Sequence, residues 1–357
     1  MDLSFLPFSK KRDAVALDIG SSSIKLVQMS QTKQGWELTK LGKADLPPEA
    51  IVDGSIIDSM TVTNTLKELM SEHGIKVKDS VSSLTGHSVI IKKVSFPAMA
   101  EEELAESIQW EAEQYIPFPV SEVNIDFQIL GADIEGRGQM DVMLVAVKKD
   151  VINDYTTVIN EAGLTPVVID VDSFALENMM EINYPVTPGE TVAVVNVGAS
   201  ITSISVIVSG LTIFTRSIPM GGNQFTEEIQ RQLNVSFKDA ENLKIGRSEA
   251  DSDMTSLPAA IDTVSTNLAF EVKRSLDFFL GGTQGAYVNK IYLSGGSSKI
   301  EGLQLLMQEK TGIPVEMVYP FKNIEISVKG YDDEMLKDVA PFFGVAVGLA
   351  TRRFGDR

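Results

Sequence analysis

The chain has 357 residues but no cysteine and only two histidines, His73 and His87. Without cysteine it has neither a disulfide framework nor thiolate chemistry, which fits a reducing cytosol. The histidines do not cluster with carboxylates, so neither a zinc site nor a histidine-based catalytic triad is expected. No apolar run approaches the ~18–20 residues that cross a bilayer, so the sequence predicts no transmembrane helix.

Positive charge is also scarce. The chain carries 31 Lys and Arg against 49 Asp and Glu, a formal net charge of -18. This balance argues against nucleic acid as a partner, because nucleic-acid binding needs a basic face. It also argues against simple electrostatic adhesion to anionic lipid. The hydrophobic content of 43% and the length predict two or three globular domains with cores of their own.

The N-terminal tail, residues 1–13, combines two features. Four apolar residues come first and three consecutive basic residues follow, without the cleavage site of a signal peptide: Leu3, Phe5, Leu6, Phe8, Lys10, Lys11 and Arg12. We expect a frayed end that packs loosely on the body. A weak contact with a membrane or a partner is the alternative.

The segment 14–27 reads as a buried strand, a tight polar turn and a second strand. Asp18 ends the first strand and Gly20 opens the turn, which continues with three serines. Backbone N–H groups and hydroxyls in such a turn can surround a phosphate, and Asp18 is placed to hold a hydrated Mg²⁺ beside it. Taken alone, the pattern also suits an ordinary hairpin turn.

The same pattern recurs 178 residues later, because Asn196 and Gly198 follow an apolar strand and lead into Ala199, Ser200 and another strand. A second echo joins 143–169 to 291–318: each has a strand, a helix, a glycine that ends the helix and a proline that starts the next strand. Two such echoes indicate two homologous halves. Their two turns, facing each other, would hold a polyphosphate between them.

Other segments suggest further contacts. Glu241 and Lys244 share one face of a short predicted helix and either bind a ribose or form a surface ion pair. Gly295 and Gly296 follow a strand and let a flat ring lie against the backbone. No P-loop and no G-x-G-x-x-G pattern is present. Asp170 ends a strand, where it could contact a water near a nucleotide, whereas Asp172 or Ser173 can cap the next helix.

Further expectations concern secondary structure. Residues 14–46 are predicted to form a β-meander with a turn at Gly42, and 99–115 an acidic helix. This helix is a solvated face or part of a partner-docking subdomain. Gly344 and Gly348 give the helix near the C-terminus a small-residue face, which would let two helices cross closely at a hinge.

On these residues the chain resembles the actin, Hsp70 and sugar-kinase superfamily, over about 14–352. The two turns resemble its phosphate loops, and 293–297 resembles its adenosine motif. Within the superfamily, 18–27, 113–118 and 196–198 are most similar to the PilM family of type IV pilus assembly proteins, whose fold is FtsA-like. The resemblance implies ATP in the interdomain cleft. It also implies docking of the cytoplasmic N-terminus of the inner-membrane protein PilN.

The patterns and the resemblance together predict the site residues. Asp18 and Asp170 are the catalytic candidates, and Asp18 holds Mg²⁺ through a bound water. The phosphate set is Gly20, Ser21, Ser22, Ser23, Lys25, Asn196, Gly198, Ala199, Ser200 and Gly222. The ribose and adenine set is Glu241, Lys244, Gly295, Gly296, Ser297 and Lys299.

The expected fold is α/β, an actin-like duplicated RNase H-like pair of domains with an FtsA-type inserted subdomain. After the tail, the first half takes 14–88 and 164–190, and the insertion takes 89–163. The second half takes 191–222 and 286–338, its smaller subdomain 223–285, and a C-terminal helix 339–357 returns to the first half.

One departure from the superfamily bears on activity. An Asp usually occupies the position of Asn196, and an amide offers no charge to a metal ion or a water. We therefore expect ATP binding with slow or absent turnover, in a cytoplasmic adaptor that reaches the inner membrane only through partners, with a possible homo-oligomer. An FtsA-like filament-forming ATPase and a small-molecule kinase are the alternatives.

Overall fold

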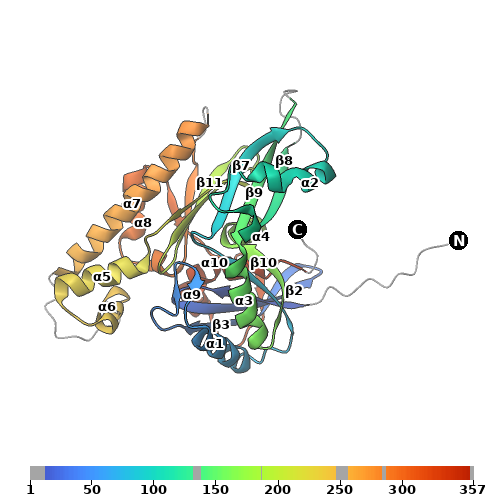
Figure 1. The fold of residues 1–357 in the computed structure, drawn as a ribbon. Helices are drawn as coiled ribbons and strands as arrows, with labels where there is room; N and C mark the ends of the chain where they lie inside the picture. Colours follow the sequence, from blue (N-terminus) through green and yellow to red (C-terminus); the bar gives the residue numbers. More distant parts are fainter. Residues whose placement is uncertain (1–12, 132–137, 186, 247–255, 284–286, 354–357) are drawn as a thin grey trace.

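The computed structural model describes residues 13–131, 138–185, 187–246, 256–283 and 287–353; the tail up to Arg12 lies outside them. Two large sheets, a three-stranded sheet and a two-stranded ribbon of β4 (Ile51–Val52) and β5 (Ser55–Ile56) make up the described strands. Figure 1 shows three lobes: the C-terminal sheet with α5–α8, the N-terminal sheet with α1 and α3, and a smaller lobe with β7–β9 and α2.

The first sheet has the spatial order β10-β6-β1-β2-β3-β16, in which β1, β2 and β3 are antiparallel neighbours and the other pairs are parallel. The bounds are β1 Ala14–Ile19, β2 Ser23–Thr32, β3 Gly35–Asp45, β6 Asp79–Leu84, β10 Thr165–Val171 and β16 Ile324–Ile326. The predicted meander is confirmed.

The predicted turn at Gly42 is wrong, because Gly42 lies inside β3, paired with Leu26 of β2. A Cβ at Gly42 would stand 2.5 Å from ring atoms of His73. The glycine therefore makes room for the imidazole that follows helix α1 and does not reverse the chain.

The second sheet has the order β13-β12-β11-β14-β15. Its bounds are β11 Thr191–Val197, β12 Thr202–Val208, β13 Leu211–Ile218, β14 Lys290–Ser294 and β15 Val315–Met317. As in the first sheet, a three-stranded antiparallel meander is extended by parallel strands on the side of its first strand. The two sheets thus share one connectivity.

The second sequence echo, of 143–169 with 291–318, correctly matches the helix, the glycine and the strand after it. Its match between the strands that precede the helices is wrong. Gly163 and Gly312 both have positive φ after their helices. However, the topological equivalent of β14 is β6, which pairs with both β1 and β10. The segment 143–147 belongs to β9 of the third sheet, because the inserted lobe separates β6 from the helix that follows it in the repeat.

Both faces of each large sheet are covered. In β1, Val15 and Leu17 join the core under the outer helices, whereas Ala14 and Ala16 join the core between the halves. Strand β11 divides its residues in the same way. Such double burial explains the near-continuous apolar runs of these strands.

The helices cover these faces as follows. Helices α1 and α3 pack on the outer face of the first sheet, α5, α7 and α8 on that of the second, and α4 and α10 between the halves. The bounds are α1 Ser59–Glu72, α3 Lys149–Glu161, α4 Asp172–Asn183, α5 Gly222–Leu233, α6 Phe237–Lys244, α7 Leu257–Gly282, α8 Leu303–Thr311, α9 Asp333–Val339 and α10 Gly344–Leu349.

Helices α4 and α10 cross at glycine positions, as the small-residue face predicts. A Cβ at Gly348 would stand 1.6 Å from the carbonyl oxygen of Ala175, and one at Gly344 would stand 2.6 Å from Ser294 Oγ. At Gly348 the backbones of the two helices are therefore in direct contact, whereas Gly344 leaves room for the Ser294 side chain of β14.

The third sheet has the order β7-β9-β8, and α2 packs on it. The bounds are β7 Val89–Pro97, α2 Glu101–Ala112, β8 Val123–Gly131 and β9 Gln139–Lys148. Helix α2 is shorter at both ends than the predicted 99–115. It buries Leu104, Ile108 and Ala112 on the sheet.

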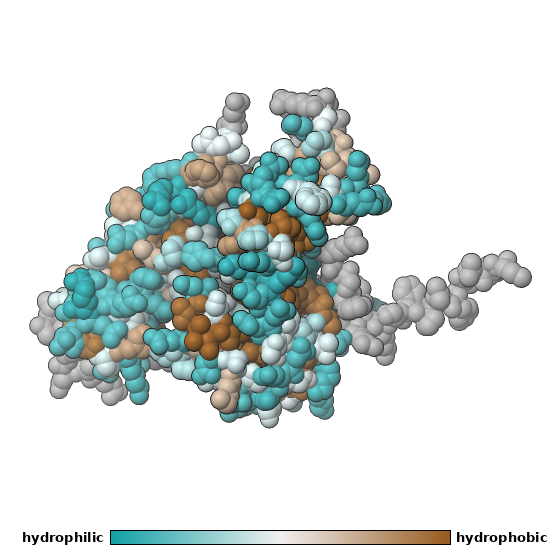
Figure 2. All heavy atoms as spheres, in the orientation of Figure 1, coloured by the Kyte–Doolittle hydropathy of each residue, from teal (hydrophilic) through white to brown (hydrophobic). Residues whose placement is uncertain are grey.

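The predicted fold class is confirmed by these two similarly wound halves with an inserted lobe. Figure 2 shows a face covered mainly by hydrophilic residues, with hydrophobic residues gathered near its middle. In the described part of the chain, no helix is long and apolar enough to cross a membrane.

Candidate functional site

The two predicted phosphate turns face each other across a cleft between the halves. In the first, the Gly20 N–H donates to the Ser23 carbonyl at 3.1 Å; in the second, the Gly198 N–H donates to the Ile201 carbonyl at 3.0 Å. The Ser200 hydroxyl donates to Ser21 Oγ at 3.0 Å, which joins the two turns directly. The duplication has thus produced two similarly closed hairpins that meet tip to tip.

Most of the predicted phosphate residues line this cleft. Those in its wall are Asp18, Gly20, Ser21, Ser22, Lys25, Asn196, Gly198, Ala199 and Ser200, together with Gly295 and Gly296 from the predicted adenine set. Ser23 is buried and supports the first turn through its carbonyl. Gly222, Glu241, Lys244 and Ser297 form a network behind the second turn, and Asp170 and Lys299 point elsewhere, as described below.

The two turns differ in charge. Asp18 and Lys25 are cross-strand neighbours whose carboxylate and ammonium lie 3.3 Å apart. In the second hairpin the equivalent neighbours are Asn196 and Ser203. Both members of the ion pair are therefore replaced by neutral side chains, so one wall of the cleft is charged and the other is only polar.

Asp172 also lines the cleft, although the sequence suggested only a capping role. That suggestion is wrong: the N-cap of α4 is Val171, without a side-chain bond, and Asp172 Oδ1 accepts from the Ser83 hydroxyl at 2.6 Å. Burial, reinforced by the Asp18 carboxylate, raises the pKa of Asp172 to about 7. This carboxyl can hold or release a proton near neutral pH.

Tyr155 completes this corner of the cleft, and its hydroxyl donates to the Ile19 carbonyl at 3.5 Å. Burial raises its pKa, so the ring stays neutral. No motif around Tyr155 predicts a place in the cleft. Its helix, α3, follows the inserted lobe in the sequence and is far along the chain from both turns.

Asp170 lies outside the cleft wall. Its Oδ1 accepts from the Val171 N–H at 2.8 Å, and its Oδ2 lies 2.9 Å from Arg352 Nε. Burial raises its pKa, and Arg352 opposes this shift. The structure therefore places Asp170 in contact with the C-terminal segment. Asp172, two residues later in the chain, is the carboxylate that faces the cleft.

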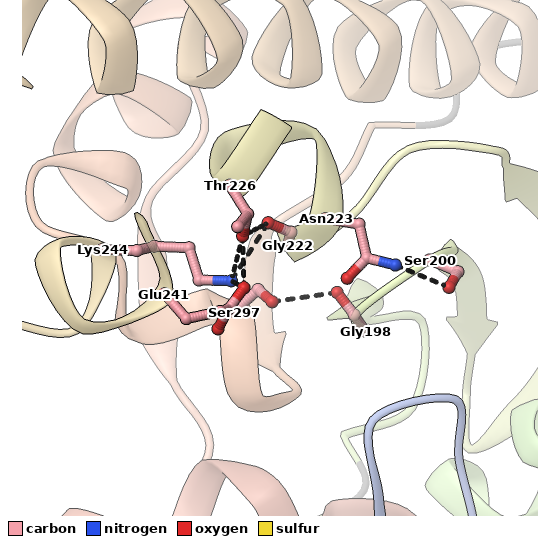
Figure 3. Close-up of polar contacts among 8 residues, drawn as sticks. All are labelled: Gly198, Ser200, Gly222, Asn223, Thr226, Glu241, Lys244 and Ser297. Carbon is pink, nitrogen blue, oxygen red and sulfur yellow. Dashed lines mark hydrogen bonds and ion pairs between the residues drawn. The ribbon is translucent and has the colours of Figure 1, made fainter. Parts of the chain in front are cut away.

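A polar network supports the second turn from behind, as Figure 3 shows. Lys244 Nζ donates to Thr226 Oγ1 at 2.8 Å and to the Gly222 carbonyl at 3.2 Å, and it also pairs with Glu241. Burial lowers the pKa of Lys244, which Glu241 opposes. The pair of Glu241 and Lys244 is therefore part of a network that reaches α5. It is more than the isolated surface ion pair that was one of the two expectations from the sequence.

Two further bonds in Figure 3 join this network to the turn. Ser297 Oγ donates to the Gly198 carbonyl at 2.9 Å, and Asn223 Nδ2 donates to Ser200 Oγ at 3.2 Å. The first N–H groups of α5 also donate to the turn, from Gly222 to the Gly198 carbonyl and from Asn223 to the Ala199 carbonyl. The start of α5 thus fixes the turn's shape.

The paired glycines that follow β14 are sterically required. Gly295 has φ +89, and a Cβ there would stand 2.3 Å from the Val197 carbonyl oxygen. A Cβ at Gly296 would stand 2.5 Å from the ring of Phe342, which also lines the cleft. Lys299 instead pairs with Asp338 on α9, which directs its ammonium outside the cleft wall.

The residues present fit a nucleotide phosphate chain. Three hydroxyls, of Ser21, Ser22 and Ser200, and the ammonium of Lys25 face one cleft, and all can donate to an anion. Among the described residues no cluster of three or more acidic, His or Cys side chains could enclose a metal ion. Asp18 and Asp172 are the two carboxylates that the described residues bring to the cleft wall, and they would hold a Mg²⁺ ion only through bound water and phosphate oxygens.

The fold and the cleft define the class: this is an actin-like protein in which two similar turns meet at a cleft between the halves. The family described as type IV pilus assembly protein PilM matches residues 16–354. The chain belongs to this family.

Solved structures agree with this assignment. A chain of the PilM–PilN type IV pilus biogenesis complex is 31% identical, with a TM-score of 0.86 over 96% of this chain and 98% of that one. The ethanolamine utilization protein EutJ from Carboxydothermus hydrogenoformans, 15% identical with a TM-score of 0.59 over 96% and 90%, shares the fold.

Cell division proteins FtsA are more distant relatives. The protein of Bacillus subtilis (strain 168) is 23% identical over 64% of this chain and 57% of its own length, so the match spans little more than half of that protein. The protein of Streptococcus pneumoniae serotype 2 (strain D39 / NCTC 7466) is 22% identical over 85% and 75%.

Proposed function

We propose that the chain binds ATP in the cleft between its halves and acts as a cytoplasmic adaptor of the type IV pilus assembly platform. The observation that carries the proposal is the meeting of the two turns through Ser21 and Ser200, with Lys25 beside them. Hydroxyls from both walls and one ammonium suit a phosphate chain. The network of Glu241 and Lys244 would face the ribose, and Gly295 and Gly296 the base.

The partner in this proposal is the N-terminal segment of PilN. Support comes from the likeness to a chain of the PilM–PilN type IV pilus biogenesis complex, at 31% identity over nearly the whole of both chains. Through PilN the protein would lie at the inner face of the bacterial inner membrane.

Turnover in the cleft would be slow. Phosphoryl transfer depends on charge that positions a metal ion and a water, and the second turn offers only Asn196 opposite Ser203. Asp18 would hold Mg²⁺ through a bound water. ATP would act chiefly by setting the angle between the halves, and the PilN-binding surface would respond to that angle.

The first experiment measures binding of a fluorescent ATP analogue with Mg²⁺. The unmodified chain should bind, and Lys25→Met should weaken binding about tenfold or more, since it removes the only cation of the cleft wall in the described residues. Lys310→Met is the matched control, because Lys310 pairs with Glu309 outside the cleft. Equal affinity of both variants would refute the site.

The second experiment measures the affinity of a PilN N-terminal peptide with ATP, with ADP and without nucleotide. The adaptor proposal expects the three affinities to differ, and equal affinities would end it. Sedimentation with and without ATP tests the FtsA-like filament alternative, which predicts ATP-dependent pelleting.

A further inference from the structure

A second hollow lies between the halves, at the other end of α4. Helix α4 begins at Asp172 in the nucleotide cleft and runs for 12 residues, about 18 Å, before it ends. Its last turn and the loop after it form one wall of the hollow, and the ends of β11, β12 and β14 form the other. The hollow thus touches both halves, far from the phosphate turns.

The floor of this hollow is apolar and aromatic. Met180 and Tyr184 come from α4 and its end, and Val192, Ile207 and Tyr292 come from the second sheet. The rings of Tyr184 and Tyr292 lie 4.7 Å apart between centroids. Such a floor suits apolar side chains.

Three carboxylates stand on its walls, those of Glu177, Glu181 and Glu190. Glu177 Oε2 accepts the Thr212 N–H at 2.6 Å, and burial raises the pKa of Glu177, with Glu181 adding to the shift. No ion pair joins any of the three to a cation in the part of the chain that the structure describes. The hollow therefore combines an apolar floor with uncompensated negative charge.

Two lysines stand near the rings, but neither forms an ion pair with these three glutamates among the described residues. Lys290 pairs with Glu316 at 2.9 Å. The Lys322 ammonium lies 4.8 Å from the centre of the Tyr184 ring. The occupant that fits the hollow is therefore a short segment with both apolar and basic side chains.

The chain carries such a segment close by. Asn323 Nδ2 donates to the Ile182 carbonyl near the end of α4, and Ile324 pairs with Trp36 at the start of β3. Strands β1 and β3 are both antiparallel to β2, so α4 ends at the edge of the first sheet where β1 begins. Ala14 of β1 pairs with Asp79, and Asp79 pairs with Thr165, the first residue of β10. The start of β1 at Ala14 therefore lies at the same edge of the first sheet as the end of α4, which lines the hollow.

The order of residues in that segment also matches. At ~3.3 Å per extended residue, a chain from Ala14 can reach at most about 13 Å by Lys10 and about 36 Å by Leu3. In the hollow, Glu177 and Glu181 belong to α4 of the first half, which also contains Ala14, and most of the apolar floor belongs to the second half. Basic residues would thus meet carboxylates first, and apolar residues would reach the floor beyond them.

We propose that this hollow binds the chain's own N-terminal segment, residues 1–12. Its three basic residues pair with the glutamates, and Phe5 and Phe8 cover the aromatic floor. Because both halves line the hollow, the bound segment connects them at the end opposite to the nucleotide. This proposal does not depend on the nucleotide or PilN proposals.

Disulfide trapping tests the proposal cleanly, since the chain has no cysteine. The full chain with Phe8→Cys and Thr187→Cys, an exposed position of the hollow, is oxidised under mild conditions. The control pairs Phe8→Cys with Gln34→Cys, an exposed residue between β2 and β3 at the same edge of the first sheet. We expect an intrachain disulfide at least tenfold faster with Thr187→Cys than with the control.

Charge reversal adds a second readout. Glu181→Lys, added to the chain with Phe8→Cys and Thr187→Cys, should slow formation of the intrachain disulfide several-fold. Adding Lys11→Glu as well should restore the rate, because it recreates a pair of opposite charges. Equal trapping at both positions, or disulfides only between chains, would overturn the proposal. The proposal would also be overturned if Glu181→Lys left the trapping rate unchanged and the full chain bound vesicles of anionic phospholipid. The tail would then be a membrane contact.

Discussion

Replacing Gly348 by alanine tests how the two halves are joined. Gly348 lies in α10 at its crossing with α4, where an added Cβ would stand 1.6 Å from the Ala175 carbonyl oxygen and 2.5 Å from its carbonyl carbon. Ordinary van der Waals contact begins near 3.4 Å. The obstacle is backbone, so no side-chain rotation relieves it, and the helices must separate by well over an ångström.

The magnitude follows from two opposing effects. Alanine in place of glycine favours a helix by about 1 kcal/mol. Overpacking a close-packed site costs about 1–3 kcal/mol and more where backbone must move. Because the backbone must move here, we take the overpacking cost at about 3–4 kcal/mol, and subtracting the helix gain leaves a net destabilisation of about 2–3 kcal/mol for Gly348→Ala. Gly281→Ala in α7 is the matched control, since nothing lies within 4 Å of its added Cβ, and this variant should gain up to about 1 kcal/mol.

Urea unfolding followed by tryptophan fluorescence measures both variants. With a denaturant dependence of about 3 kcal/mol per molar, Gly348→Ala should unfold about 1 M earlier than the unmodified chain, and Gly281→Ala at the same concentration or slightly later. If the two substitutions shift the midpoint in the same direction, the close contact of Gly348 with the Ala175 backbone does not contribute to stability as expected.

Three further predictions concern the cleft. Asn196→Asp supplies the charge that the second turn lacks and should raise ATP hydrolysis about tenfold in a phosphate-release assay; an unchanged rate would show that this charge does not limit turnover. Lys244→Met leaves the Glu241 carboxylate unpaired and should weaken ATP binding about tenfold, whereas Lys310→Met should leave it unchanged. Burial raises the pKa of Asp172 from 3.8 to about 7, so the folded chain holds a proton that the unfolded chain has released. The free energy of unfolding should therefore decrease as the pH rises from about 4 to about 7. Asp172→Asn should make the urea midpoint at pH 7.5 closer to the midpoint at pH 5 than it is in the unmodified chain.

Local pattern was sufficient for the duplicated hairpins. Apolar strands that end at Asp18 and Asn196, each followed by a glycine and small polar residues, correctly predicted both strand pairs and the two similar halves; the fold class came from the family resemblance that these residues carry. The errors arose where a residue serves a distant neighbour. Gly42 looks like a turn residue in sequence, but its partner is His73, 31 positions away, and only the packed structure reveals this.

The site was predicted well along the two turns and poorly beyond them. Thr226 and Phe342 reach the network and the cleft through helix packing, and neither stands in a recognisable pattern. Asp172 did carry a signal, since a strand leads directly into a helix there, but the signal was read as a cap. A carboxyl at the start of a helix is usually a cap. Only the positions of Ser83 and Asp18 reveal its other role.

The charge difference between the two turns links the site to the proposed role. The second turn has Asn196 opposite Ser203, where the first turn has Asp18 opposite Lys25. Both charges are therefore absent together, and no unpaired cation stands at position 203. The neutral wall keeps its hydroxyl and backbone geometry, including the bond from Ser200 to Ser21. We infer that the second half retains what is needed to hold a phosphate chain and lacks what is needed to activate a water, which suits a protein that senses a bound nucleotide.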